Sequence, residues 1–112
     1  MPCDDRVTAA QMLDAVRRIR AIVRGQTRDA FEADEVRQLA LLHLIQVLGQ
    51  VASRTTAALR DAHPELPWAQ MVAMRNRIVH GYDDVDPDIV WRVATEDVEP
   101  VLAALEQMLQ GR

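Results

Sequence analysis

The sequence predicts an all-α protein whose single domain spans residues 1–112. Three observations support this prediction. Apolar residues make up 49% of the chain but aromatic residues only 4%, so that Ala, Leu, Val and Met supply most of the core, a mixture that favours helix over sheet. These apolar residues recur at helical spacing. Glycine is scarce, and the prolines stand in a few places where helices would begin or end. We therefore expect a bundle of four or five helices.

The first helix is expected to end at about Arg24, with Gly25 as its C-terminal stop. Asp4, Asp5 and Thr8 are the candidates for its N-cap. Several arginines crowd the C-terminal half of this helix: Arg17, Arg18, Arg20 and Arg24. Cations in this position complement the helix dipole, so a structural role is favoured over contact with RNA.

A second helical region is expected to open at Thr27 or Asp29 and to continue to about Asp61. Its stretch LALLHLIQVLGQVA is apolar on more than one side, which is typical of a central helix or of a helix at a subunit interface. His43 in this stretch is expected to be hydrogen-bonded or to lie at an interface rather than to bind a ligand. Gly49 costs roughly 1 kcal/mol relative to Ala in a helix, so it predicts the close approach of another helix.

The two prolines of HPELPW must end this helical region. Pro67 suits the first turn of a third helix, in which Trp68 would anchor the helix to the core. Gly81 is expected to follow this helix in a left-handed conformation. Asp86 and Pro87 predict the start of a fourth helix, and the helical pattern then continues to the end of the chain.

The acidic run of this region resembles a calcium loop only superficially, because it lacks the required glycine and the terminal Glu. It consists of Asp83, Asp84, Asp86 and Asp88. Helix caps and turns explain these carboxylates without a metal. The three histidines lie far apart with no companion Cys, so no zinc pattern is present, and no phosphate-binding glycine loop occurs.

The net charge of −4 argues against a general polyanion binder, so that any chemistry on nucleic acid must be local. All basic residues are Arg, because the sequence contains no Lys. The single Cys3 cannot form an internal disulfide, and the N-terminus has no signal-peptide pattern. No stretch is apolar enough for a membrane helix. We expect a soluble, cytoplasmic protein.

The segment RNRIVHGY, residues 75–82, carries the candidate site. Asn76 and His80 share a helix face, whereas Arg75 and His80 lie roughly 140° apart around a straight helix. A structural interpretation leaves Asn76 and His80 exposed and Arg75 in a surface ion pair. A functional interpretation places His80 in the last turn, where the helix dipole favours the imidazolium and Asn76 can orient the ring.

Arg75 could then reach toward the same phosphate as His80. A His and an Arg are a minimal set for cleaving a phosphodiester without metal, with the His exchanging protons and the Arg stabilising charge on the phosphate oxygens. One His cannot act as acid and base at once. A second copy of the chain would supply the missing group, which favours a homodimer.

Residues 67–91, PWAQMVAMRNRIVHGYDDVDPDIVW, resemble the HepT-like branch of the HEPN superfamily. The hallmark of this branch is Arg, four residues, His, one residue and Tyr, which Arg75, His80 and Tyr82 meet, with the polar Asn76 after the Arg. The resemblance extends more loosely over the whole chain. In the second helix the family tends to have Gly-Glu-Ala where this sequence has Gly49-Gln50-Val51.

The resemblance implies a helical HEPN homodimer that is the toxin of a type VII, HEPN–MNT, toxin–antitoxin pair. Such toxins cut RNA (tRNA or mRNA) without metal through a 2′,3′-cyclic phosphate, with the motifs of both subunits facing one cleft. The same resemblance makes Arg75 and His80 the catalytic pair and Asn76 the orienting group, which would hold the imidazole ring. Tyr82 is the residue to which an MntA-like minimal nucleotidyltransferase, using ATP and Mg²⁺, transfers AMP. The toxin itself needs no cofactor.

Two alternatives remain open at this point. The protein could be a non-catalytic helical binding partner of a minimal nucleotidyltransferase. It could also be a structural dimer with an unrelated ligand, an alternative left by Gly49-Gln50-Val51 in place of the family's triplet.

Overall fold

The computed structural model describes residues 3–111, and this range contains helices and turns but no strand. The prediction of an all-α fold is therefore confirmed. Four long helices form the bundle: α1 (Cys3–Val23), α3 (Glu35–Ser53), α5 (Trp68–Gly81) and α7 (Val98–Gly111). The shorter elements are α2 (Arg28–Glu32), α4 (Ala57–Ala62), the 3₁₀ turn η1 (Tyr82–Asp84), α6 (Pro87–Arg92) and the π-helical turn η2 (Val93–Asp97).

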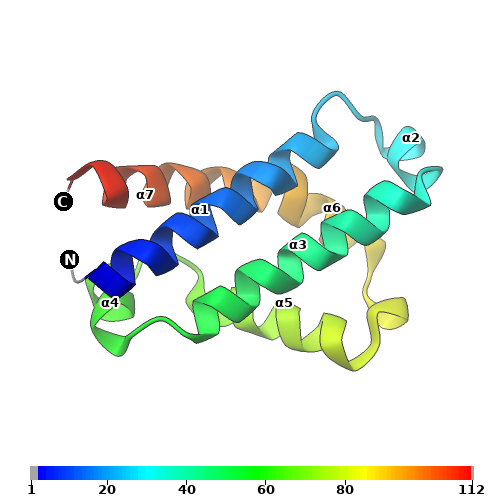
Figure 1. Cartoon of the computed structure of the whole chain (residues 1–112). Helices are drawn as coiled ribbons and strands as arrows, with labels where there is room; N and C mark the ends of the chain where they lie inside the picture. Colours follow the sequence, from blue (N-terminus) through cyan, green and yellow to red (C-terminus); the bar gives the residue numbers. More distant parts are fainter. Residues whose placement is uncertain (1–2, 112) are drawn as a thin grey trace.

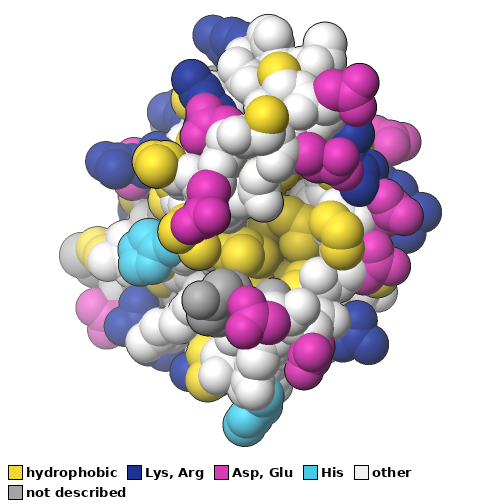
Figure 2. Space-filling model, turned by 90° about the vertical axis from the view of Figure 1, so that its right-hand side faces the viewer, with side chains coloured by type: hydrophobic (Ala, Val, Ile, Leu, Met, Phe, Trp, Pro, Cys, Tyr) yellow, Lys and Arg dark blue, Asp and Glu magenta, His cyan; other side chains and the backbone are white. Residues whose placement is uncertain are grey.

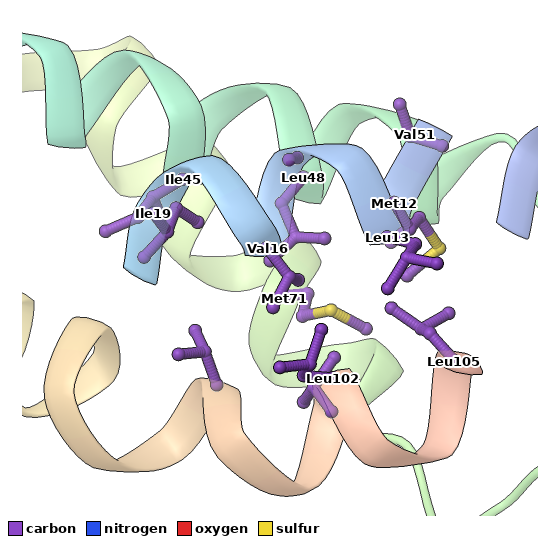
Figure 3. Packing of buried hydrophobic residues seen from close by; sticks show 14 of the residues in the cluster. Met12, Leu13, Val16, Ile19, Ile45, Leu48, Val51, Met71, Leu102 and Leu105 are labelled. Carbon is purple, nitrogen blue, oxygen red and sulfur yellow. The ribbon is translucent and has the colours of Figure 1, made fainter. Parts of the chain in front are cut away.

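The long helices pack in a chain of neighbours. α1 packs against both α3 and α7, and α5 packs against α3 (Figure 1). The molecule is elongated, with principal extents of 43 × 29 × 19 Å. Side chains from all four helices meet in the core, where Val16, Leu48, Met71 and Leu102 lie close together (Figure 3). No helix in residues 3–111 is long and apolar enough to cross a membrane.

The first helix begins earlier than predicted. α1 starts at Cys3, so Asp4, Asp5 and Thr8 lie inside it, and the prediction that one of them is the N-cap was wrong. Thr8 Oγ1 donates instead to the carbonyl of Asp4 (2.9 Å), and the buried Asp5 carboxylate accepts a hydrogen bond from Thr56 Oγ1 (3.2 Å). The predicted end is confirmed, because α1 stops at Val23 and Gly25 has a φ of +73°.

Three arginines lie in the second half of α1, since Arg24 follows the helix, and all three form ion pairs, in line with a structural role. The pairs are Arg17–Glu106 (3.1 Å), Arg18–Asp14 (3.0 Å) and Arg20–Glu99 (2.9 Å). Two of these pairs tie α1 to α7. All three are partly exposed, so each contributes at most about 1 kcal/mol.

The second helical region is three helices, α2, α3 and α4, and the prediction of one helix from Thr27 or Asp29 to about Asp61 was wrong. A polar side chain restarts the helix at each break. The N-caps are Thr27, which accepts from Ala30 N (3.0 Å), Asp34, which accepts from Arg37 N (3.0 Å), and Thr56, which accepts from Leu59 N (3.1 Å). Only the central piece, α3, carries the run that is apolar on more than one side.

The predictions for the third helix are confirmed except at its end. Pro67 directly precedes α5, and the buried Trp68 donates from Nε1 to the carbonyl of His63 (2.9 Å). Gly81 is the last residue of α5 but is not left-handed, because Gly25 is the only glycine with a positive φ in residues 3–111. The chain continues from Gly81 straight into the right-handed 3₁₀ turn η1, which needs no left-handed residue.

Candidate active site

Arg75 lies where α5 packs against the backbone of α3 at Gly49. The prediction that Gly49 marks a close approach of another helix is confirmed: a Cβ on Gly49 would overlap the Cβ of Arg75 and the carbonyl oxygen of Met71, and would lie 3.3 Å from Arg75 Cγ. Gly49 is buried. The aliphatic stem of Arg75 therefore runs in the seam between the two helices.

The guanidinium of Arg75 has few partners. Its Nη1 donates to Asn76 Oδ1 (2.9 Å), and its Nε is buried without a hydrogen-bond partner. No carboxylate among residues 3–111 comes within 4.0 Å of it, so the surface ion pair of the structural interpretation does not form. A buried donor left unpaired costs about 1–3 kcal/mol and is rare in folded proteins, so this arrangement does not stabilise the fold.

Asn76 and His80 are both exposed on α5, as their shared helix face predicts. The hydrogen bond that Asn76 makes goes to Arg75 and not to His80. In this structure Asn76 therefore orients the guanidinium rather than the imidazole.

His80 lines a shallow hollow between the end of α5, η1 and the start of α6, with a volume of about 560 Å³. Its other lining residues are Arg77, Gly81, Asp84, Val85, Asp86 and Ile89. Arg75 is not among them. Because α5 stays helical through Gly81, Arg75 and His80 point in directions about 140° apart, and one chain does not bring them together.

Arg77 is the residue of this hollow that the sequence analysis did not single out. It is exposed and precedes His80 by three residues, so both lie along the same side of α5. The i, i+3 spacing in RNRIVH was the available signal. Asp84 and Asp86 oppose its charge in the hollow, which makes the local surface mixed rather than basic.

Tyr82 is the first residue of η1, two residues after His80, and its side chain lies outside the described residues.

Figure 2 shows the end of the molecule formed by α2, α6 and the end of α5, where acidic side chains surround a hollow with an apolar floor. This end is not a general basic surface for nucleic acid, in agreement with the net charge of the chain.

The acidic run contributes a helix cap, as predicted, and also an ion pair that was not predicted. Asp86 caps α6 by accepting from Asp88 N (2.9 Å), with Pro87 as the first helical residue. Asp88 pairs with Arg28 (2.5 Å), and Arg28 also pairs with Glu32. The hydrogen bond to Asp88 raises the pKa of Arg28 above its ordinary value, and the hydrogen bond to Glu32 raises it further by a smaller amount. No three His, Cys, Asp or Glu side chains in the described range are arranged to share a metal ion.

His43, predicted to be hydrogen-bonded or to lie at an interface, is exposed and makes no hydrogen bond to the described residues. It lies on a second shallow surface formed by α3 and α5, beside Leu39, Leu42, Gln46, Ile78 and Val79. Several large apolar side chains of these two helices are exposed to solvent: Val36 by 77%, Leu39 by 46% and Val79 by 48%. The alternative that His43 lies at an interface stays a prediction.

Comparison with known proteins identifies the relatives of this chain. The family model described as ribonuclease HepT-like matches residues 12–108. A protein of Thermococcus cleftensis named "Probable ribonuclease HepT" is 25% identical over 95 residues, which cover 85% of this chain and 86% of that protein. A "Putative RNase" of Caldanaerobacter subterraneus subsp. tengcongensis is 23% identical over 88 residues, with 79% of each chain covered.

A further "Putative RNase", from Methanocaldococcus jannaschii, is 22% identical over 107 residues, which cover 96% of this chain and 88% of the relative. No solved structure matches the chain with statistical significance. The family model covers most of the bundle, including α5 with its Arg, Asn and His. This chain belongs to the HepT-like ribonuclease family.

Proposed function

We propose that this protein is a metal-independent endoribonuclease that acts as a homodimer, and that it is the toxin of a toxin–antitoxin pair. The observation that carries the proposal is the state of Arg75. Its guanidinium is held by the α3–α5 seam and by Asn76, has no acidic partner among the described residues, and lies on the same helix as the exposed His80. An unpaired, positioned guanidinium suits a phosphate.

The chemistry follows from these two groups. One His80 imidazole accepts the proton of a ribose 2′-hydroxyl, the 2′-oxygen forms a bond to phosphorus, and the bond from phosphorus to the 5′-oxygen breaks. A protonated imidazole gives its proton to the leaving 5′-oxygen, so that a 2′,3′-cyclic phosphate and a 5′-hydroxyl result. Arg75 stabilises the charge on the non-bridging oxygens in the transition state.

A second chain would supply the second imidazole that the reaction needs and that one chain lacks. Arg75 and His80 of one chain diverge, and one imidazole cannot be acid and base in the same step. The exposed apolar side chains of α3 and α5, among them Leu39 and Val79, border the same side of α5 as Arg75, since Val79 follows Arg75 by one helical turn. Burial of these side chains against a second copy would bring two α5 helices to one cleft.

Cleavage of RNA in EDTA tests the catalytic proposal. We expect the purified protein to cleave RNA and to leave 2′,3′-cyclic phosphate ends, and Arg75→Ala or His80→Ala to lower the rate by at least about 100-fold. His63→Ala and Arg92→Ala are matched controls, because they remove the same residue types from other elements, and they should retain full activity. A wild type without activity would favour the non-catalytic binding partner. A His80→Ala variant as active as the wild type would contradict the catalytic role of His80.

Regulation of the toxin belongs to the same proposal. Tyr82 follows His80 by two residues at the start of η1. An adenylate on its hydroxyl would add bulk and negative charge beside the site where RNA phosphate must bind, and so block the enzyme by occupancy and repulsion. The partner would be a minimal nucleotidyltransferase that uses ATP and Mg²⁺.

Intact-mass measurement tests this modification. Co-expression with a small nucleotidyltransferase encoded beside the gene is expected to add one or more AMP units to the wild type and none to Tyr82→Phe. The same co-expression should suppress growth inhibition by the wild type but not by Tyr82→Phe, which keeps both catalytic residues. An unmodified wild type whose toxicity is nevertheless neutralised would contradict control through Tyr82.

A further inference from the structure

The seam between α3 and α5 holds Arg75 at a point where no side chain on α3 can be accommodated. A Cβ at position 49 would collide with two atoms that are fixed to the backbone of α5, the Cβ of Arg75 and the carbonyl oxygen of Met71. Neither atom can move away by rotation of a side chain. A side chain at position 49 must therefore move α5 away from α3, against which it packs (Figure 1), at the turn that carries Arg75.

The buried part of Arg75 shows that this contact controls the side chain as well as the backbone. Cγ lies 3.3 Å from the place that a Gly49 Cβ would take, and Nε is buried against the seam with no hydrogen-bond partner. Only the outer end of the guanidinium is held by a polar group, Asn76 Oδ1. The stem of Arg75 is therefore held by packing in the seam, and the outer end of the guanidinium by one hydrogen bond to Asn76.

We propose that Gly49 is a positioning residue of the active site, which fixes the guanidinium of Arg75 by allowing its stem to lie directly on the backbone of α3. This inference rests on the proposed ribonuclease function. It assigns Gly49 a part in the reaction that differs from a general role in stability. A misplacement of about 1 Å at a catalytic group is enough to lower a rate by about 100-fold.

The test compares Gly49→Ala with Val51→Ala. Val51 is buried on the same helix but about 200° around it from Gly49, so its truncation weakens the core without touching the seam at Arg75. We expect Gly49→Ala to lower kcat for RNA cleavage by about 100-fold when measured on the folded protein. Val51→Ala should lower thermal stability and leave the kcat of the folded protein unchanged. A Gly49→Ala variant with wild-type kcat, or an equal loss in Val51→Ala, would overturn the inference.

A double-mutant cycle separates action through Arg75 from a general disturbance. In an Arg75→Ala background the Cβ of residue 75 and the Met71 carbonyl oxygen still displace α5, but the guanidinium is gone, so Gly49→Ala should cause less than a tenfold further loss of activity. A further loss of tenfold or more in the Arg75→Ala background would contradict the inference. If the wild type itself cleaves no RNA, the proposed function fails, and the positioning role in catalysis fails with it.

A measurement on the wild type covers the case in which Gly49→Ala does not fold. The Nε–H of Arg75, buried in the seam, should exchange with solvent more slowly in ¹⁵N NMR spectra than that of the exposed Arg77 on the same helix. Equal exchange at Arg75 and Arg77 would show that the seam does not hold the stem, and would overturn the inference.

Discussion

At the residue scale, the two proposed catalytic side chains differ in how they are held. Arg75 is fixed by packing along its stem and by Asn76, whereas His80 is exposed at the rim of a hollow. A fixed cation that stabilises charge and a freer imidazole that exchanges protons are the states that their proposed roles require.

Replacement of Gly25 and of Gly81 by Ala should change the stability of the protein in opposite directions. Gly25 has a φ of +73° and open space around it, so Gly25→Ala should destabilise the protein by about 1–2 kcal/mol through backbone strain alone. Gly81 is right-handed and helical, and an added Cβ would meet only the exposed Asp84 carboxylate at 3.3 Å. Gly81→Ala should therefore leave stability unchanged or raise it, by up to about 1 kcal/mol.

Urea denaturation of the two variants measures these differences. Equal midpoints for Gly25→Ala and the wild type would show that Gly25 is not the left-handed stop of α1. A large loss of stability in Gly81→Ala would show that the helix ends there in a left-handed turn, as the sequence alone suggests.

The residues of the candidate site could be predicted from the sequence, but their environment could not. The spacing in RNRIVHGY predicts which side chains share a face of α5, and Asn76 and His80 are exposed accordingly. The seam around Arg75 depends on a glycine 26 positions earlier in the chain. The hollow around His80 depends on how η1 turns back beside α5. The seam and the hollow both arise from contacts between different elements, and the periodicity of one helix carries no information about such contacts.

At the element scale, periodicity predicted the helices better than their ends. In a long helical pattern, a capping residue cannot be told from a polar residue on the solvent-exposed face. Asp34 and Thr56, the N-caps of α3 and α4, therefore did not indicate that one helix ends and another begins there. Asp86 was recognisable because Pro87 follows it and fits only the first turn of a helix.

The π-helical turn η2 is another feature that periodicity does not predict. It inserts a wider turn between α6 and α7, and Thr95 Oγ1 donates to the carbonyl of Trp91 (2.7 Å) within this segment. A π-helical turn holds about one residue more than an α-helical turn. The side chains of α7 are therefore rotated around the helix axis relative to those of α6, and this rotation turns the apolar face of α7 toward α1.

At the scale of the whole molecule, the α3–α5 face joins the proposed site to the proposed dimer. The helix α3 buries one side in the core and leaves Val36 and Leu39 exposed on another. The sequence predicted either a central helix or an interface helix for the apolar run of this helix. The structure places it centrally, and its exposed face is the surface that we propose for the second chain.

The central claim is that two chains complete one site that cuts RNA without metal. Its most direct test is RNA cleavage in EDTA by mixtures of wild type and His80→Ala that are unfolded together and refolded at constant total protein. Random pairing predicts that an equal mixture keeps about one quarter of the wild-type activity, because only dimers with two intact copies of His80 are active. Mixing with His63→Ala should leave activity unchanged. A fall in simple proportion to the wild-type fraction, to about one half in the equal mixture, would contradict the claim.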